Sequence, residues 1–211
     1  MLRPVSLSLA VLLVAGNAGA QNQSRFELGA YGGYLSGGTA EGEAGPLRAK
    51  ATIESAPSYG GFIDIAVRRG AFAELSYSRQ PTELSLRVSD GTSYRYDLLV
   101  QHFQIGGLLE FNTPALDWLR PTFGGTIGAT VFTANDDRAS YEEWRASIIL
   151  EGGAKIRLTD HFGLRLRARG FATFLTDDSA LFCASGVGCA YAFTGTAVLQ
   201  GEVGAGAYLA F

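Results

Sequence analysis

Residues 196–211 alternate between two unlike sets of side chains, and no other feature of the sequence constrains the fold as strongly. Counted back from Phe211 in steps of two, one set holds only Phe, Leu, Val, Ala and Gly. The other set carries the polar side chains of this stretch, including Gln200 and Glu202. A period of two is typical of a β-strand whose two faces meet different surroundings. We therefore predict a C-terminal strand with one continuous apolar face that ends on an aromatic residue.

The same alternation occurs in seven earlier stretches of the sequence. They cover residues 26–34, 59–68, 73–78, 102–111, 120–131, 144–158 and 162–174. The last of these is the sharpest, because Leu and Ala alternate there with Arg165, Arg167 and Arg169. Together with the C-terminal stretch, they predict eight β-strands.

Aromatic residues lie at both ends of the predicted apolar faces. One group is Phe26, Phe111, Phe123, Phe162 and Phe211, and the group at the opposite ends is Tyr34, Tyr59, Tyr77, Trp144 and Phe174. A strand from Phe162 to Phe174 spans roughly 28 Å when it is tilted by about 45°, close to the ~25 Å apolar band of membrane barrels. The core of a soluble sheet gives no reason for aromatic side chains at two fixed heights. The pattern therefore favours strands that cross a membrane.

The predicted connections alternate between long and short. In chain order they are 36–58, 69–70, 80–94, 112–119, 133–143, 159–161 and 176–194. Long surface loops and short periplasmic turns alternate in this way in outer-membrane barrels. An even number of strands also lets the first and last strands pair, so that no edge remains. A bilayer requires this closure, because each unpaired backbone group in lipid costs several kcal/mol.

The C-terminal aromatic strand, the two aromatic rings and the alternating connections resemble the small OmpA, OmpX and opacity-porin class of outer-membrane barrels. The resemblance implies an all-β, eight-stranded antiparallel up-and-down transmembrane β-barrel in the bacterial outer membrane. It also implies that Phe211 is the signal read by the barrel-assembly machinery, and that outer-membrane lipid and lipopolysaccharide surround the protein. We expect no peptidoglycan-binding module after Phe211.

The N-terminal residues predict export. Arg3 precedes a mostly apolar run at 5–15, and Ala18-Gly19-Ala20 offers a small-x-small cleavage site. The run is shorter than the about 20 residues that a membrane-spanning helix needs. We therefore predict a signal peptide at 1–20 and a mature barrel at 21–211.

Composition limits the partners. The net charge of −3 gives no broad basic surface, so we expect no nucleic-acid partner. Cys183 and Cys189 lie close together, and in an exported protein they predict a small disulfide-closed loop. No further Cys or His lies near them to complete a metal site, and the sequence contains no H-E-x-x-H, G-x-S-x-G or P-loop pattern. We predict neither a metal nor a cofactor.

The polar strand faces carry most of the remaining charges. Eight strands enclose only enough space for side chains to fill, so charges facing inward would lie close together and would be costly unless paired. The predicted lumen network is Asp64, Glu74, His102, Glu151, Lys155, Arg167, Arg169 and Glu202. Arg169 and Glu202 lie at similar heights on neighbouring strands and are the expected pair. Such a network would plug the lumen, and a gated pore for ions or small solutes is the alternative.

His102 is the second candidate site, because some barrels of the class that the sequence resembles modify lipid A with a catalytic His. A nucleophile would need a base within hydrogen-bond reach and an orienting carboxylate. No H-x-S element is present, and His161, the second histidine, lies in a predicted periplasmic turn. We therefore predict no enzyme, and a lumen His102 that bonds Gln or Glu.

The surface loops are the third candidate. Residues 82–88 and 92–98 are β-prone and flank Asp90-Gly91, a strong hairpin signal. We predict a hairpin that protrudes past the membrane, kinked at Pro81, whose edge could add a strand of a surface protein partner. The function expected is thus a structural or adhesion-like surface role. A small pore is the alternative, and a lipid A-modifying enzyme is the second alternative.

Overall fold

A computed structural model describes residues 26–211 except 45–46, 90, 137–138, 176–191 and 194–196. The predicted signal peptide, Cys183 and Cys189 lie outside the described residues. Among the described residues, no helix has the length and apolarity of a transmembrane span.

The described residues form one antiparallel sheet. Its strands are β1 (Phe26–Leu35), β2 (Thr39–Ala44), β3 (Leu47–Ile53), β4 (Ala56–Arg68), β5 (Ala71–Val88), β6 (Ser93–Glu110), β7 (Leu119–Asp136), β8 (Ala139–Arg157), β9 (Phe162–Phe174), β10 (Ala192–Phe193) and β11 (Ala197–Ala210).

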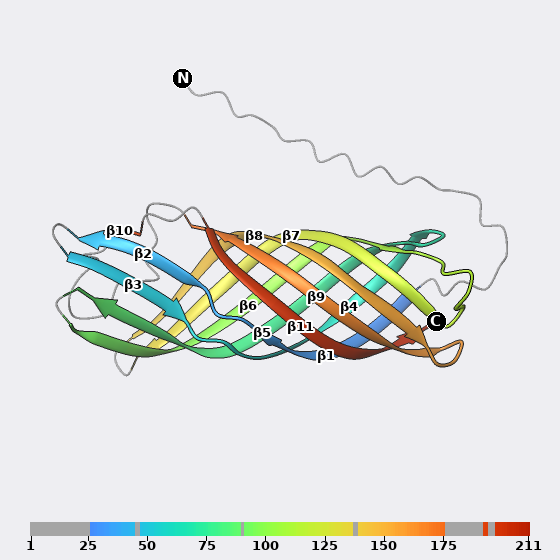
Figure 1. Cartoon of the computed structure of the whole chain (residues 1–211), viewed down its shortest axis with the longest axis horizontal. Helices are drawn as coiled ribbons and strands as arrows, with labels where there is room; N and C mark the ends of the chain where they lie inside the picture. The colour runs from blue at the N-terminus through green and yellow to red at the C-terminus, as the bar shows by residue number, and fades with distance from the viewer. Residues whose placement is uncertain (1–25, 45–46, 90, 137–138, 176–191, 194–196) are drawn as a thin grey trace, which may run out of the picture.

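Eight of these strands close into a ring, in the order β1-β4-β5-β6-β7-β8-β9-β11 and back to β1. The closing pair runs from Glu27↔Ala210 to Leu35↔Glu202, and the backbones of Phe26 and Phe211 are hydrogen-bonded at 2.9 and 3.4 Å. The eight-stranded up-and-down barrel predicted from the sequence is therefore confirmed. The short turns and the C-terminus lie at one end of the barrel, and β2, β3 and β10 lie at the other (Figure 1). The end with the longer connections is the extracellular one.

The outer wall of the ring is apolar and the inner wall is charged. On β9, residue Leu166 is 47% exposed and the adjacent Arg167 is 3% exposed. The same alternation of exposed apolar and buried polar positions occurs in the middle of β5 and β6 and in β11. A soluble barrel would require the opposite arrangement, so the ring is built for a lipid surrounding.

Two strands occur where the sequence predicted only a long connection. β2 and β3 form a hairpin, and β3 pairs with the outer part of β5 from Ala49↔Val88 to Ile53↔Leu84. The β5 edge of the protruding hairpin is therefore not open to a partner's strand, because the chain's own β3 occupies it. Ala51 and Ile53 are buried there against inward side chains of β5, and this packing stabilises β3 as a strand.

The protruding hairpin itself is present. β5 and β6 pair continuously from Ala71↔Leu109 to Arg87↔Ser93, and the register does not shift at Pro81. Pro81 lies between the last pair with β4, at Arg79, and the first pair with β3, at Leu84. The carbonyl of Glu83 accepts a bond from Glu54 at 2.9 Å, so the backbone of residue 81, two positions earlier, faces the same side. The missing N–H of Pro81 thus falls in a gap between two partner strands and costs no ladder bond.

Candidate functional site

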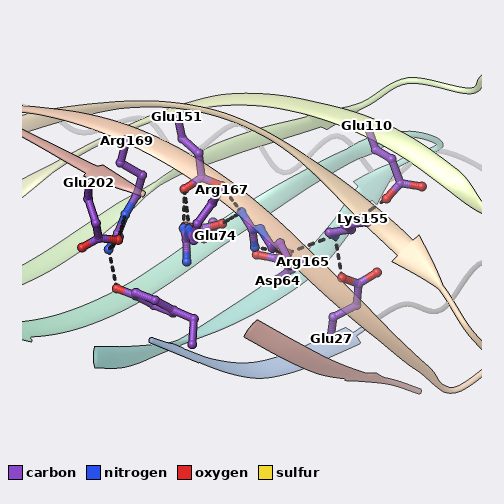
Figure 2. Close-up of polar contacts among 11 residues, drawn as sticks. Glu27, Asp64, Glu74, Glu110, Glu151, Lys155, Arg165, Arg167, Arg169 and Glu202 are labelled. Carbon is purple, nitrogen blue, oxygen red and sulfur yellow. Dashed lines mark hydrogen bonds and ion pairs between the residues drawn. The ribbon is translucent and has the colours of Figure 1, made fainter. Parts of the chain in front are cut away.

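Charged side chains from all eight ring strands converge on the barrel interior, and Figure 2 labels all of them except Arg120. The acids are Glu27, Asp64, Glu74, Glu110, Glu151 and Glu202, and the bases are Arg120, Lys155, Arg165, Arg167 and Arg169. Six acids against five bases give a formal charge of 5 − 6 = −1. We call these eleven residues the lumen network. Near-neutrality is what allows so many buried charges to share one interior.

Arg165 lies at the centre of the lumen network. Its side chain is 0% exposed, and its guanidinium bonds Asp64 at 3.2 Å, Glu74 at 2.5 Å and Glu151 at 2.5 Å. Asp64 and Glu74 belong to β4 and β5, which are not neighbours of β9 in the ring, so these bonds cross the lumen. Arg167 bonds Glu151 and also reaches Glu74 at 3.2 Å. Two guanidinium groups thus hold three carboxylates through charge-assisted bonds.

Lys155 holds the periplasmic side of the network. Its ammonium lies 2.5 Å from Glu27, 3.2 Å from Asp64 and 3.7 Å from Glu110. Glu110 in turn accepts a bond from Arg120 at 2.7 Å. Lys155 suits this position because its ammonium can donate three bonds in different directions.

Arg169 holds the outer side of the network. It is the register partner of Glu202 and bonds one oxygen of that carboxylate at 2.6 and 3.0 Å, as the similar heights of the two residues predict. Arg169 also donates to the Tyr31 hydroxyl at 2.6 Å, and Ser58 donates to Glu202 at 2.9 Å. Aromatic rings fill the remaining space beside the cations. The guanidinium carbon of Arg165 lies 4.4 Å from the centroid of the Phe62 ring, and that of Arg167 lies 4.5 Å from the centroid of the Tyr31 ring.

His102 lies above the charged layer, fully buried. Its Nδ1 is 2.8 Å from the hydroxyl of Thr130, which is 3.1 Å from the hydroxyl of Thr173. The partner is therefore a threonine and not the Gln or Glu expected. The Nε2 atom has no hydrogen-bond partner among the described residues, so no carboxylate orients the ring as a catalytic triad would require.

A layer of buried apolar side chains lies at the outer end of the interior. It consists of Ala51, Ile53, Leu84, Leu86, Leu98, Val100, Phe132 and Val198. Val100 and Phe132 are 0% exposed. We call this set the outer apolar cluster. It was not predicted, although inward positions of β5 change from Ser78 and Gln80 to Leu84 and Leu86, a switch that is visible in the sequence.

The family follows from comparison with known proteins. Residues 6–193 match the model of the outer membrane protein beta-barrel domain. The chain belongs to this family. It is an outer-membrane β-barrel, as the sequence and the lipid-facing apolar wall both indicate.

Solved structures agree with this assignment at the level of the fold. The barrel is similar to Neisserial surface protein A, at 13% identity and a TM-score of 0.59 over 89% of this chain and 98% of that one. It is also similar to the outer membrane protein OprG from Pseudomonas aeruginosa, at 12% identity and a TM-score of 0.58 over 90% and 99%. AlkL, an outer membrane protein whose structure was solved in lipid bilayers, matches at 15% identity and a TM-score of 0.53 over 93% and 94%. Comparison with curated protein sequences gives no match.

Every residue expected in the lumen of the outer-membrane barrel is buried there. His102 lies in the layer above the charges, beside Thr130. Four members of the lumen network that the prediction left out are Arg165, Arg120, Glu27 and Glu110. Arg165 lies on the same strand face as Arg167, so the period of two would have found it. Phe211 lies on the outer wall beside Phe26, with ring centroids 6.0 Å apart. Within the described ranges, no group of three His, Cys, Asp or Glu residues could hold a metal ion.

Proposed function

We propose that this outer-membrane barrel has a closed lumen and a structural or surface-interaction role, carried by the strands that extend outward from the membrane. The observation that carries the proposal is the burial of the whole interior. A water-filled passage would leave its lining accessible, yet Arg165, Val100 and Phe132 are each 0% exposed. Cations, polar groups and apolar side chains thus fill successive layers of the interior.

The extension offers a surface for partners. The outer halves of β5 and β6 pair with each other, and β3 and β2 continue the sheet on the β5 side. The outward side chains of the β5–β6 hairpin include Glu83, Arg87 and Arg95, all exposed. A paired sheet with charges of both signs is an ordered platform, because its backbone needs no ordering when a partner binds.

Recording in planar bilayers tests the closed lumen. We expect no discrete conductance from the purified barrel, and none from Arg169→Ala, since the outer apolar cluster still blocks the interior. Discrete openings in the unchanged protein would contradict the proposal, and their alteration in Arg169→Ala would support the pore instead.

A loop replacement tests the surface role. Exchanging residues 83–97 for a short Asn-Gly turn should leave a barrel that still migrates differently before and after boiling. Cells that display this variant should bind less to one another and to immobilised extracellular matrix than cells that display the full barrel. Equal binding by folded variant and full barrel would contradict the surface role.

The pore and the lipid A-modifying enzyme remain as the two alternatives. For the pore, Arg167 Nη1 and Asp64 Oδ1 have no hydrogen-bond partner among the described residues, so the network has spare polar atoms that a solute could meet. For the enzyme, the contact of Thr130 with His102 is a hydroxyl beside an imidazole. Incubation with lipopolysaccharide followed by mass measurement of lipid A tests the enzyme, and a changed mass would overturn the proposal.

A further inference from the structure

The outer wall of β4, β5 and β6 changes character at Arg79. Below it, toward the periplasm, the outward positions of these strands are apolar, as at Leu75 and Ile105, which are more than half exposed. Arg79 points outward because the even-numbered neighbours Ser78 and Gln80 are buried. Among the described outward-facing residues of the ring, it is the first Lys or Arg above the periplasmic turns.

Arg79 lies at the height of the outer aromatic ring and is held there. Its guanidinium carbon is 5.8 Å from the centroid of the Tyr59 ring, and Tyr59 is its register partner on β4. Its partner on the other side is Gln101 of β6, whose amide donates to the Tyr77 hydroxyl at 2.8 Å. The guanidinium is thus flanked by an aromatic face and an oriented amide.

Arg79 has no anionic partner among the described residues. Its Nε is buried without a hydrogen-bond acceptor, whereas each arginine of the lumen network bonds a carboxylate. The outward acid nearest along β5, Glu83, pairs instead with Arg95 at 3.6 Å. A charged donor at the edge of the lipid band is costly when it has no acceptor, so an acceptor from outside the chain is needed.

We propose that Arg79, with Tyr59 and Gln101 beside it, binds a phosphate group of the lipid A part of lipopolysaccharide. At the outer aromatic ring, the wall of an outer-membrane barrel meets the head groups of the outer leaflet. A guanidinium is planar and presents paired donors that match phosphate oxygens. The flat Tyr59 ring and the Gln101 amide are suited to lie against the adjoining sugar. The site lies on the outer wall, so it is independent of whether the lumen conducts.

Native mass spectrometry of the detergent-solubilised barrel, titrated with diphosphorylated lipid A, tests this site. Arg79→Gln should weaken binding about tenfold or more, because a lost hydrogen bond to a charged group changes affinity by that order. Arg79→Lys keeps the charge but lacks the planar pair of donors. Its affinity for lipid A should therefore lie between those of the unchanged protein and Arg79→Gln. Arg95→Gln, on the same wall farther from the membrane, is the matched control and should bind as the unchanged protein does.

Titrations with other lipids identify the ligand. Lipid A stripped of its phosphates and phosphatidylglycerol should both bind the unchanged barrel at least several-fold more weakly than diphosphorylated lipid A. Equal binding of the dephosphorylated lipid would overturn the phosphate site, and equal binding of phosphatidylglycerol would overturn the assignment to lipid A. If Arg79→Gln still migrates differently before and after boiling and binds lipid A with unchanged affinity, the role of Arg79 would be overturned.

Discussion

The interior of the barrel is charged within the membrane and apolar beyond it. In the membrane, Arg165 contacts three carboxylates across the lumen, whereas Phe132 and Val100 pack among aliphatic side chains at the outer end. The side chains of both regions are buried, yet their chemistry is opposite. The cause is the surrounding medium: where lipid covers the wall, polar side chains can only turn inward, and where water covers it, apolar side chains turn inward.

One strand contains both arrangements. Along β5, Glu74, Ser76 and Ser78 face the lumen while Leu75 faces lipid. Beyond Pro81 the inward positions are Leu84 and Leu86, and Glu83 faces outward. The strand keeps its period of two and its register with β6 through this change. The inversion therefore marks the outer edge of the membrane without any break in the sheet.

Loss of Arg165 tests the charged region most severely. Arg165→Met should lower the free energy of unfolding by about 3–5 kcal/mol or more, because removing one partner leaves buried charges uncompensated. Urea unfolding in lipid vesicles, followed by the fluorescence of Trp118 and Trp144, measures the effect. Arg157→Met, exposed at the periplasmic end, is the control and should change stability by less than about 0.5 kcal/mol. Equal stability of Arg165→Met and the unchanged protein would show that the carboxylates do not depend on this guanidinium.

Truncation of Leu98 tests the outer apolar cluster. Leu98→Ala should cost about 2–5 kcal/mol, through lost transfer energy and the cavity that remains. The loss should be local, so amide hydrogen exchange should rise in β3 and residues 84–88 and stay constant in β9. Leu98→Met conserves volume and should cost less than about 1.5 kcal/mol. Faster exchange throughout the ring would indicate that the two regions unfold as one unit.

The ring strands were predictable because lipid outside and charge inside impose the period of two on every crossing. The pairs within the lumen were harder to predict. Arg169 and Glu202 are adjacent in register, so their similar heights on neighbouring strands were enough to predict the pair. Arg165 reaches Glu74 across the lumen, from β9 to β5, and that contact depends on the tilt and stagger of the closed barrel, which no single strand encodes.

The β2–β3 hairpin and the outer apolar cluster were missed for a related reason. Residues 39–44 and 47–53 do alternate in polarity, but each run is short, and their strands depend on a partner, the outer edge of β5, that lies far along the chain. The inversion at residues 80–84 is present in the sequence but is recognisable only once the membrane edge has been located. The prediction thus found the long alternating runs that cross lipid, and not the short ones whose strands depend on pairing with another strand.

A double-mutant cycle measures one buried pair. Arg169→Met and Glu202→Leu should each destabilise the barrel, whereas the double variant should recover part of the loss, with a coupling energy of about 0.5–3 kcal/mol. Recovery is expected because two apolar side chains of similar volume can replace a buried ion pair at little cost. Additive losses in urea unfolding would show that Arg169 depends mainly on Tyr31, its other partner at 2.6 Å.

The pair of Arg95 and Glu83 provides the same chemistry outside the membrane. Its atoms are 3.6 Å apart and its side chains are 76% and 52% exposed. Arg95→Gln and Glu83→Gln should each cost only about 0.2–1 kcal/mol, because water screens the pair and two long side chains must be ordered to form it. In 1 M salt, where the screening length falls to roughly 3 Å, the coupling between them should vanish, while that of Arg169 and Glu202 should persist. A salt-resistant coupling at the exposed pair would mean that strand pairing, and not the surrounding medium, determines how strongly these ions interact.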